Sequence, residues 1–236
     1  CEGRVNELEK SVNQINLSGT IGIGHVRWAT HGKPSSINAH PHSSDNVSVV
    51  HNGIIENSTI LKKILEKKGY KFKSQTDTEV IVHLVTDYLK KNNLKDTIIK
   101  VLKKLHGSFA LGIIFKDQPD LIIGARRGSP LAVGYGPDEH YLGSDSYALK
   151  SMTNKISYLN DGEFCILKKD QVEFFDTDGI KTNKEVLNLS KDEQNYEKGQ
   201  YKYFMAKEID EQPVTIKNCI NEYIDCLLYT SPSPRD

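Results

Sequence analysis

The sequence predicts an α+β fold in which stacked β-sheets are covered by helices. Three observations lead to this expectation. Two short apolar stretches, at residues 21–28 and 47–50, have the composition of core strands and end in clusters of polar residues. Three amphipathic helical segments follow, and a long series of strand-like segments comes after them. Two groups of strands with helices outside imply two sheets packed face to face and covered on both outer faces.

The three helical segments are marked by start signals, stop signals or both. The first follows Asn57 and Ser58, has apolar residues at helical spacing, and ends at Gly69. The second is predicted to start at Asp77, inside a Thr-x-x-Glu capping box formed by residues 76–79, and to continue to Leu89. The third is expected over residues 94–105, with Gly107 ending it.

From residue 108 onward the pattern changes to short segments rich in β-branched and aromatic residues. Hairpin turns are predicted at Asp161-Gly162 and Asp178-Gly179. The predicted strands are 108–115, 121–125, 131–135, 141–144, 156–159, 163–167 and 172–175.

The chain turns polar after residue 183, and one more helix is expected to begin near Pro213. We therefore expect a main domain over residues 1–212 whose own start is missing. Residues 213–226 are expected to be a linker or the start of a further part, and residues 227–236 to be a non-native tail.

The composition of the chain indicates which classes of molecule it is suited to bind. The 31 basic and 31 acidic residues balance, so no net field favours nucleic acid or an anionic membrane, and small polar ligands fit better. Apolar runs fall far short of the roughly 20 residues that a membrane-spanning helix needs. The cysteines show no CxxC spacing and no secretory signal precedes them, which favours the cytoplasm.

Residues 24–32 concentrate polar chemistry at the end of the first predicted strand. Within nine residues the sequence brings together two imidazoles, a guanidinium, an indole and a hydroxyl. Arg27 on its own would be read as half of a surface ion pair. Beside Trp28 and two histidines, its planar fork is instead suited to bidentate binding of a carboxylate.

The tripeptide His51-Asn52-Gly53 follows the second predicted strand and has two interpretations. Asn-Gly is the strongest short turn signal, so the pair could be a turn. The alternative is an oxyanion hole, in which the Asn52 amide and the Gly53 N–H point at one developing negative charge. Asp77 is also ambiguous, because an acid in a first helical turn offsets the helix dipole but can equally pair with a substrate ammonium.

Histidines raise a competing possibility. Five of the eight fall at His25, His31, His40, His42 and His51, and His40-Pro41-His42 could hold zinc or another divalent ion. The same residues could equally form a loop that is held together by hydrogen bonds. Apart from Asp45 no acidic residue stands among them, although metal-bound histidines usually have carboxylate partners.

Three long motifs occur in order: GHVRWATHGKPSSINAHPH from Gly24, VVHNGIIEN from Val49 and SQTDTEVI from Ser74. Together they resemble the glutaminase domain of the isomerising glutamine:fructose-6-phosphate aminotransferases, which are class II glutamine amidotransferases. The resemblance extends from about Gly3 to Ile220. Related class II amidotransferases share the Asn-Gly pair and the acid without the whole motif set.

The resemblance implies an N-terminal nucleophile hydrolase fold, a four-layer αββα sandwich, here lacking its first strand region. By motif, Arg27 binds the α-carboxylate of glutamine and Asp77 its α-ammonium group. Asn52 and Gly53 form the oxyanion hole. The glutamine pocket and its cover are lined by Trp28, Thr30 and His31.

The beginning of the chain departs from the family. The family's enzymes start with Cys-Gly-Ile, whereas Cys1 is followed here by Glu2-Gly3. We therefore expect the catalytic cysteine to be missing and this fragment to be inactive. The intact enzyme would hydrolyse L-glutamine and pass ammonia to an isomerase half that converts fructose 6-phosphate to glucosamine 6-phosphate, in hexosamine biosynthesis.

No metal or organic cofactor is implied, and a homo-oligomer is expected for the full-length enzyme. Three alternatives stay open. They are a non-catalytic glutamine-binding fragment, another class II amidotransferase, and a histidine-rich metallohydrolase.

Overall fold

The computed structural model describes residues 5–15, 19–28, 31–189 and 198–230, with side chains up to residue 221. The chain divides into two compact units, residues 1–189 and 190–236. None of the helices in the described part is both long and apolar enough to cross a bilayer. The first unit contains both sheets and every described residue of the motifs discussed above.

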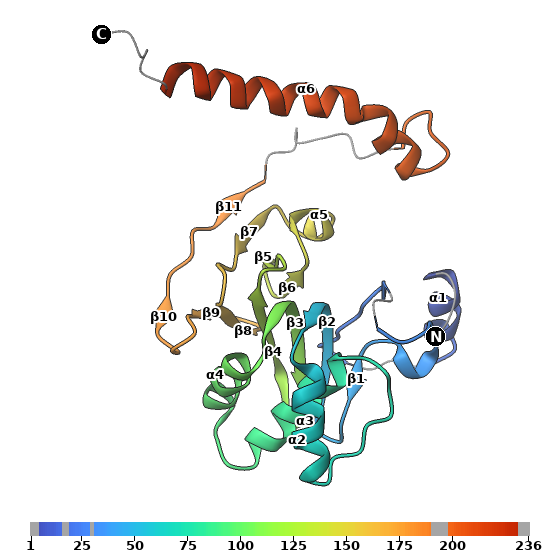
Figure 1. Cartoon of the computed structure of the whole chain (residues 1–236), viewed down its shortest axis with the longest axis vertical. Helices are drawn as coiled ribbons and strands as arrows, with labels where there is room; N and C mark the ends of the chain where they lie inside the picture. Colours follow the sequence, from blue (N-terminus) through green and yellow to red (C-terminus); the bar gives the residue numbers. More distant parts are fainter. Residues whose placement is uncertain (1–4, 16–18, 29–30, 190–197, 231–236) are drawn as a thin grey trace. The chain divides into compact units, whose positions relative to one another are not determined.

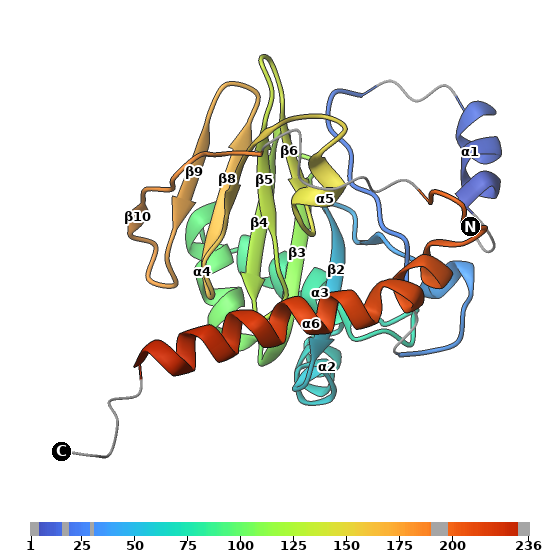
Figure 2. The ribbon, with the colours of Figure 1, turned by 90° about the horizontal axis from the view of Figure 1, so that it is seen from above.

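Two antiparallel sheets form the centre of the first unit (Figures 1 and 2). The larger has seven strands, in the order β1 (His42–Ser43), β2 (Val47–Ile55), β3 (Gly107–Phe115), β4 (Gln118–Arg127), β8 (Phe164–Lys168), β9 (Val172–Phe175) and β10 (Lys181–Thr182). The smaller has four, in the order β11 (Leu187–Asn188), β7 (Lys155–Tyr158), β5 (Ala132–Tyr135) and β6 (His140–Gly143).

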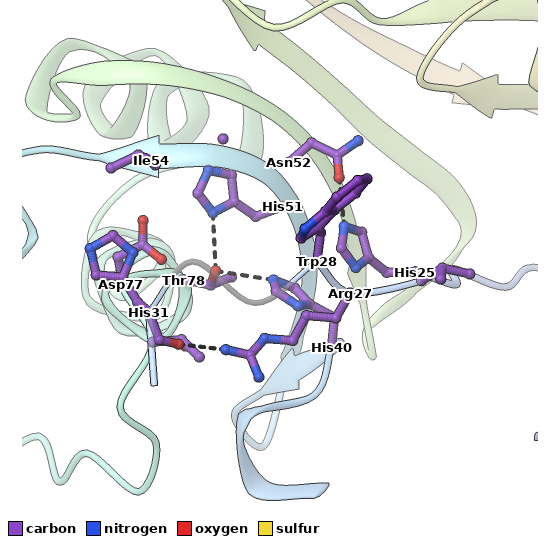
Figure 3. A pocket seen from close by; sticks show the side chains of 13 residues that line it. His25, Arg27, Trp28, His31, His40, His51, Asn52, Ile54, Asp77 and Thr78 are labelled. Atoms are coloured by element: carbon purple, nitrogen blue, oxygen red, sulfur yellow. Dashed lines mark hydrogen bonds between the residues drawn. The ribbon is translucent and has the colours of Figure 1, made fainter. Parts of the chain in front are cut away.

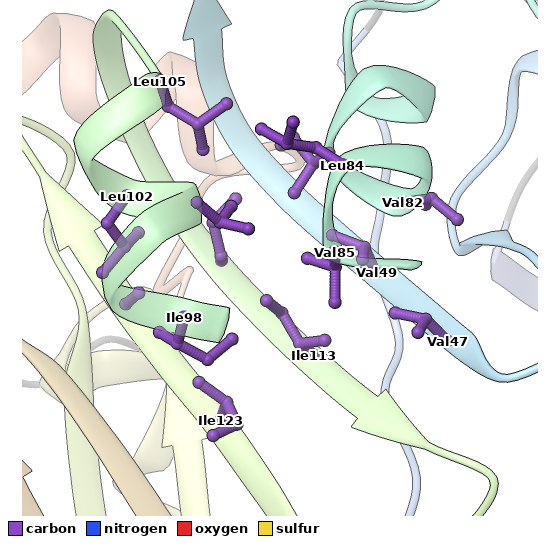
Figure 4. Packing of buried hydrophobic residues seen from close by; sticks show 14 of the residues in the cluster. Val47, Val49, Val82, Leu84, Val85, Ile98, Leu102, Leu105, Ile113 and Ile123 are labelled. Atoms are coloured by element: carbon purple, nitrogen blue, oxygen red, sulfur yellow. The ribbon is translucent and has the colours of Figure 1, made fainter. Parts of the chain in front are cut away.

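Three helices cover one face of the seven-stranded sheet (Figure 1). They are α2 (Ser58–Lys67), α3 (Thr78–Leu89) and α4 (Leu94–Lys104). Their buried faces pack on the strands, as Figure 4 shows for Val85, Ile98 and Leu102 against Ile113 and Val49. The remaining described helices are α1 (Val5–Asn13), the 3-10 turn η1 (Ser36–Asn38), α5 (Ser146–Leu149) and α6 (Phe204–Thr230).

Three apolar contact regions separate four layers. Successive side chains of a strand point to opposite faces, so in β3 Leu111 packs against the helices while Ala110 packs between the two sheets. In β5, Val133 faces the inter-sheet region and Ala132 faces outward, where Leu149 of α5 covers it. The order helix, sheet, sheet, helix is the αββα arrangement expected from the sequence, with α5 forming the described part of the outer helical layer.

The seven strands predicted after residue 108 are all present, with ends shifted by a few residues. The helices at 58–67, 78–89 and 94–104 are present too. Asp178-Gly179 is the predicted hairpin turn, between β9 and β10. Asp161-Gly162 is not a hairpin, because it connects β7 of the small sheet to β8 of the large one.

Other expectations were wrong. Residues 21–28 form no strand, because this segment has no ladder partner among the described residues. Helix α6 does not begin near Pro213 but starts at Phe204 and contains the proline. Helices α1 and α5 were not anticipated, although Val5, Leu8 and Val12 recur at helical spacing in α1, where every side chain is exposed.

The predicted capping box does not form. Helix α3 begins at Thr78 with Asp77 as N-cap, and no side chain caps it. The Glu79 carboxylate instead accepts hydrogen bonds from the N–H groups of Lys73 and Ser74, at 2.8 and 2.6 Å. Thr76 Oγ1 lies 2.9 Å from His42 Nε2. Glu79 thus bonds to the loop just before α3, and Thr76 bonds to a residue distant in the sequence, so neither group is left to form the box.

Gly53 allows β2 and β3 to approach closely. Its φ angle is +123°, and a Cβ atom built there would lie 2.1 Å from the carbonyl oxygen of Ser108 on β3. A residue with a side chain would have to adopt a strained backbone and push the strands apart.

We predict that Gly53→Ala destabilises the chain by about 2–5 kcal/mol, the combined cost of a positive φ and of overpacking. Gly22→Ala is the matched control, since a Cβ at Gly22 meets nothing within 4 Å. It should change stability by less than about 0.5 kcal/mol. Urea unfolding of both variants measures the difference. Equal stabilities would show that β2 and β3 separate here without cost.

Candidate active site

A cavity of about 370 Å³ opens beside β2, and segments far apart in the sequence contribute to its walls (Figure 3). It is lined by His25, Val26, Arg27, Trp28, His31, His40, His51, Asn52, Gly53, Ile54, Thr76, Asp77 and Thr78. The structure therefore brings six predicted site residues into one cavity: Arg27, Trp28, His31, Asn52, Gly53 and Asp77. Thr30, the seventh predicted site residue, and Cys1 lie outside the described residues.

Asn52 and Gly53 lie within β2, opposite Ala110 and Phe109 of β3. The interpretation of Asn-Gly as a turn is therefore wrong. The strand is longer than the apolar run at 47–50 suggested, because β3 pairs with it along all of residues 47–55. The positive φ of Gly53 rotates the peptide group between Asn52 and Gly53 away from the orientation of a regular strand.

The first turn of α3 holds β2 on both sides of this point. Asp77 is buried, and its Oδ2 accepts a hydrogen bond of 2.7 Å from the backbone N–H of Ile55. Thr78 Oγ1 lies 3.0 Å from His51 Nδ1 and 3.1 Å from His40 Nε2. Since a hydroxyl has one hydrogen, at least one of these two imidazole nitrogens donates to Thr78 if both bonds are made.

Arg27 organises the loop that follows it. Its Nη2 donates to the carbonyl oxygen of His31 and to that of Gly32, the second at 3.2 Å, and its Nη1 donates to that of Lys33 at 3.3 Å. Trp28 extends from the same segment, and its side chain is largely in solvent, with 89% of the residue exposed. The guanidinium and the indole border the cavity together, although their segment is not a strand.

Burial keeps several imidazoles of the site in their uncharged form. It lowers the pKa of His40 to about 3, and the neighbouring imidazoles add to the effect. Burial also lowers the pKa of His51 to about 4, with Asp77 partly opposing the shift. Both rings therefore act at neutral pH as hydrogen-bonding groups, and the full charges on the cavity wall include those of Arg27 and Asp77.

The histidine-rich loop is held together by hydroxyl groups. His40 and His51 share Thr78, and His42 contacts Thr76. Among the described residues, no group of three or more His, Cys, Asp or Glu side chains is placed to hold a metal ion. These contacts correspond to the hydrogen-bonded loop considered from the sequence, and nothing in them favours the metallohydrolase alternative.

A family model described as "Glutamine amidotransferase domain" matches residues 25–151, more than half of the chain and the segments that line the cavity. The chain belongs to the glutamine amidotransferase family. The matched range contains Arg27, Asn52, Gly53 and Asp77, so the four residues on which the sequence argument depended all lie in the family's domain.

Curated relatives agree with this assignment. The chain is 48% identical over 226 residues to "Glutamine--fructose-6-phosphate aminotransferase [isomerizing]" of Bradyrhizobium diazoefficiens, which covers 95% of this chain and 37% of the relative. The protein of the same name from Clostridium acetobutylicum is also 48% identical, with the same coverage. The chain thus spans little more than a third of the length of these relatives.

Solved amidotransferase structures share the fold. The glutamine phosphoribosylpyrophosphate amidotransferase from B. subtilis superposes with a TM-score of 0.55 and 30% identity, over 65% of this chain and 34% of that one. An "allosteric regulatory enzyme of purine biosynthesis" gives a TM-score of 0.54 at 28% identity, again over 65% of this chain. The layers described above are therefore those of the N-terminal nucleophile amidotransferases.

The sequence argument gave no role in the site to several of the residues that line it. His40 and His51 were noticed as possible metal ligands, not as parts of the wall. Thr78 had no signal of its own, because a threonine in a first helical turn is common. Its contact with two histidines from other segments is visible in the fold alone.

The imidazoles predict a pH dependence of stability. The pKa values of His40, His42, His51 and His83 are all lowered by burial. Below the unfolded value of about 6.5, the unfolded chain binds more protons than the folded chain, so stability falls as the pH drops from 6.5 toward the folded values.

We expect the free energy of unfolding to be lower at pH 5.5 than at pH 7.5, above the range where carboxylates titrate. His51→Gln should reduce that loss. His106→Gln should leave it unchanged, because His106 is exposed. Urea unfolding of the three proteins at both pH values makes the comparison, and an equal loss in the His51 variant would contradict the assignment.

Proposed function

We propose that this chain is the glutamine-hydrolysing part of an enzyme that makes glucosamine 6-phosphate from fructose 6-phosphate. One observation carries the proposal. A single cavity is bordered by a guanidinium, a carboxylate and the Asn52-Gly53 pair, which are the groups that a free amino acid with a side-chain amide requires. The names of the relatives supply the acceptor sugar.

Glutamine is anchored at its zwitterionic end. A guanidinium has five N–H donors, and three hydrogen bonds from Nη1 and Nη2 of Arg27 go to carbonyl oxygens at residues 31–33. The Nε–H and one Nη1–H remain, and because they lie on different edges of the guanidinium, one of them is available to donate to the α-carboxylate. Asp77 uses Oδ2 for Ile55, and its second oxygen can receive the α-ammonium group. Trp28 and His31 border the same cavity, and by motif we assign Trp28, Thr30 and His31 to the lining and cover of the bound amino acid.

Asn52 and Gly53 stabilise the charge that develops on the substrate. The attacked amide carbon becomes tetrahedral, and its oxygen becomes an oxyanion that accepts hydrogen bonds from the Asn52 side chain and the Gly53 N–H. Gly53 suits this role because its positive φ redirects the peptide N–H and because no side chain blocks the approach of substrate.

The nucleophile is assigned to a terminal cysteine like that of the family's Cys-Gly-Ile start. Burial raises the pKa of Cys165 to about 12, so it is not a thiolate at neutral pH. The terminal thiolate forms a C–S bond to the amide carbon. The α-amino group supplies the proton with which ammonia leaves, and water hydrolyses the thioester to glutamate.

For the full-length enzyme we propose a cytoplasmic homo-oligomer, in which ammonia passes internally to an isomerase half that binds fructose 6-phosphate. Residues 1–212 would form the glutaminase domain and 213–226 the start of that half, followed by a non-native tail at 227–236. The relatives are longer than this chain, which leaves room for such a half.

Asn52→Ala in the full-length enzyme should lower the kcat of glutamine hydrolysis by a factor on the order of 10² to 10³, because an oxyanion donor acts chiefly in the transition state. KM for glutamine should change much less. Steady-state release of glutamate measures both constants. If turnover is unchanged, Asn52 has a structural role alone.

The assignment of the nucleophile predicts that the chain as printed binds glutamine without hydrolysing it, and that Cys1→Ala changes nothing measurable. Adding a Cys-Gly-Ile start with its following segment should create glutaminase activity. A glutamine-analogue electrophile should abolish that activity by alkylating the new cysteine, as mass spectrometry would show. Activity of the printed chain that depends on Cys1 would make Cys1 the nucleophile.

A further inference from the structure

We infer that His25 is a positioning residue that sets the orientation of the Asn52 side-chain amide. This inference rests on the proposed function, since it concerns one of the two oxyanion donors. His25 Nε2 lies 2.6 Å from Asn52 Oδ1 (Figure 3). Nothing in the sequence motifs distinguished this histidine from the others near it.

The contact defines which atom is the donor. An amide oxygen accepts and does not donate, so His25 carries its hydrogen on Nε2 and donates it to Asn52 Oδ1. The other ring nitrogen, Nδ1, is buried and has no hydrogen-bond partner in the described part of the chain. Moving the hydrogen to Nδ1 would lose the bond to Asn52 Oδ1 and would place a buried N–H where it has no acceptor. A flipped Asn52 amide could donate to Nε2 and restore the first contact, but the Nδ1–H would stay without a partner.

The orientation of the amide matters because its two ends have nearly the same shape and opposite hydrogen-bonding character. Asn52 is exposed to the cavity, so packing does not distinguish the two orientations. With Oδ1 held by His25, the NH₂ group is turned away from His25 and is available as a donor. With the amide flipped, an oxygen would take the place of that donor, and it would repel an oxyanion.

His25 is held in place by a series of contacts that begins at α3, although its own segment forms no strand. Its ring centroid lies 4.4 Å from that of His40, which in turn lies 5.1 Å from that of His42. His40 contacts Thr78, and His42 contacts Thr76. The row of three imidazoles thus connects the start of α3 to the side chain of Asn52.

The first test uses the chain as printed. Long-range ¹H–¹⁵N correlation spectra of ¹⁵N-labelled protein distinguish the two histidine tautomers. We expect His25, assigned through a His25→Gln variant that lacks its signals, to carry the hydrogen on Nε2. A hydrogen on Nδ1 would overturn the inference, and so would an average of the two tautomers.

The second test is kinetic and uses the full-length enzyme. His25→Ala should lower kcat for glutamine hydrolysis roughly tenfold, as expected from the loss of one hydrogen bond, with KM nearly unchanged. His25→Gln should retain most of the activity, because its amide nitrogen can occupy the place of Nε2. His25→Asn is the matched control, because its shorter side chain places nitrogen near Nδ1, and it should behave like alanine.

The third test asks whether His25 acts through Asn52. In an Asn52→Ala background, His25→Ala should cause no further loss of kcat, since the amide that it orients is gone. Multiplying losses would overturn the inference, as would equal activities of the Gln and Asn variants. A parent enzyme that does not release glutamate, or an Asn52→Ala enzyme of normal turnover, would instead refute the proposed function and leave the tautomer result standing.

Discussion

The hydrogen bond from the Ile55 N–H to Asp77 Oδ2 is the contact on which the site depends. It joins the first turn of α3 to β2, two residues beyond Gly53, and it lies in a buried place where an unpaired carboxylate would be costly. Thr78 adds a second attachment through His51, two residues before Gly53. The strand is thus fixed on both sides of its one unusual backbone angle, which is how a strained conformation persists in a folded protein.

Because β2 is attached to α3 at both points, residues of this strand and of this helix form one wall of the cavity although they are far apart in the sequence. The loop before α3 is fixed in turn by Glu79, whose carboxylate takes the N–H groups of Lys73 and Ser74. Three carboxyl oxygens of Asp77 and Glu79 therefore accept hydrogen bonds from the backbone, and Asp77 also lines the cavity. Under the proposed function, Asp77 would therefore have a structural role and a substrate-binding role in one side chain, the two roles that its position in the sequence left open.

The sequence predicted those features whose signals are local. Helix spacing located α2, α3 and α4, and β-branched runs located the strands after residue 108. The sequence failed to predict local structure where contacts with residues distant in the sequence determine it. Residues 21–28 have strand composition but pair with no strand in the described part of the chain, and Thr76 of the predicted capping box contacts His42 instead. The motifs grouped Arg27, Asn52 and Asp77 correctly in one cavity, but the roles of His25 and Thr78 depend on contacts that no spacing encodes.

The neutral imidazoles also bear on how the proposed zwitterionic ligand would be recognised. A zwitterion is selected by one cation and one anion placed apart, and further charge on the wall would disturb that balance. His40 and His51 lie close to Arg27 and Asp77, so protonating them would add positive charge where the proposed ligand carries an ammonium group. Burial prevents this by lowering both pKa values well below neutrality. The same burial that makes these histidines destabilising in acid therefore leaves Asp77 without a competing cation beside it, as its proposed pairing with an ammonium group requires.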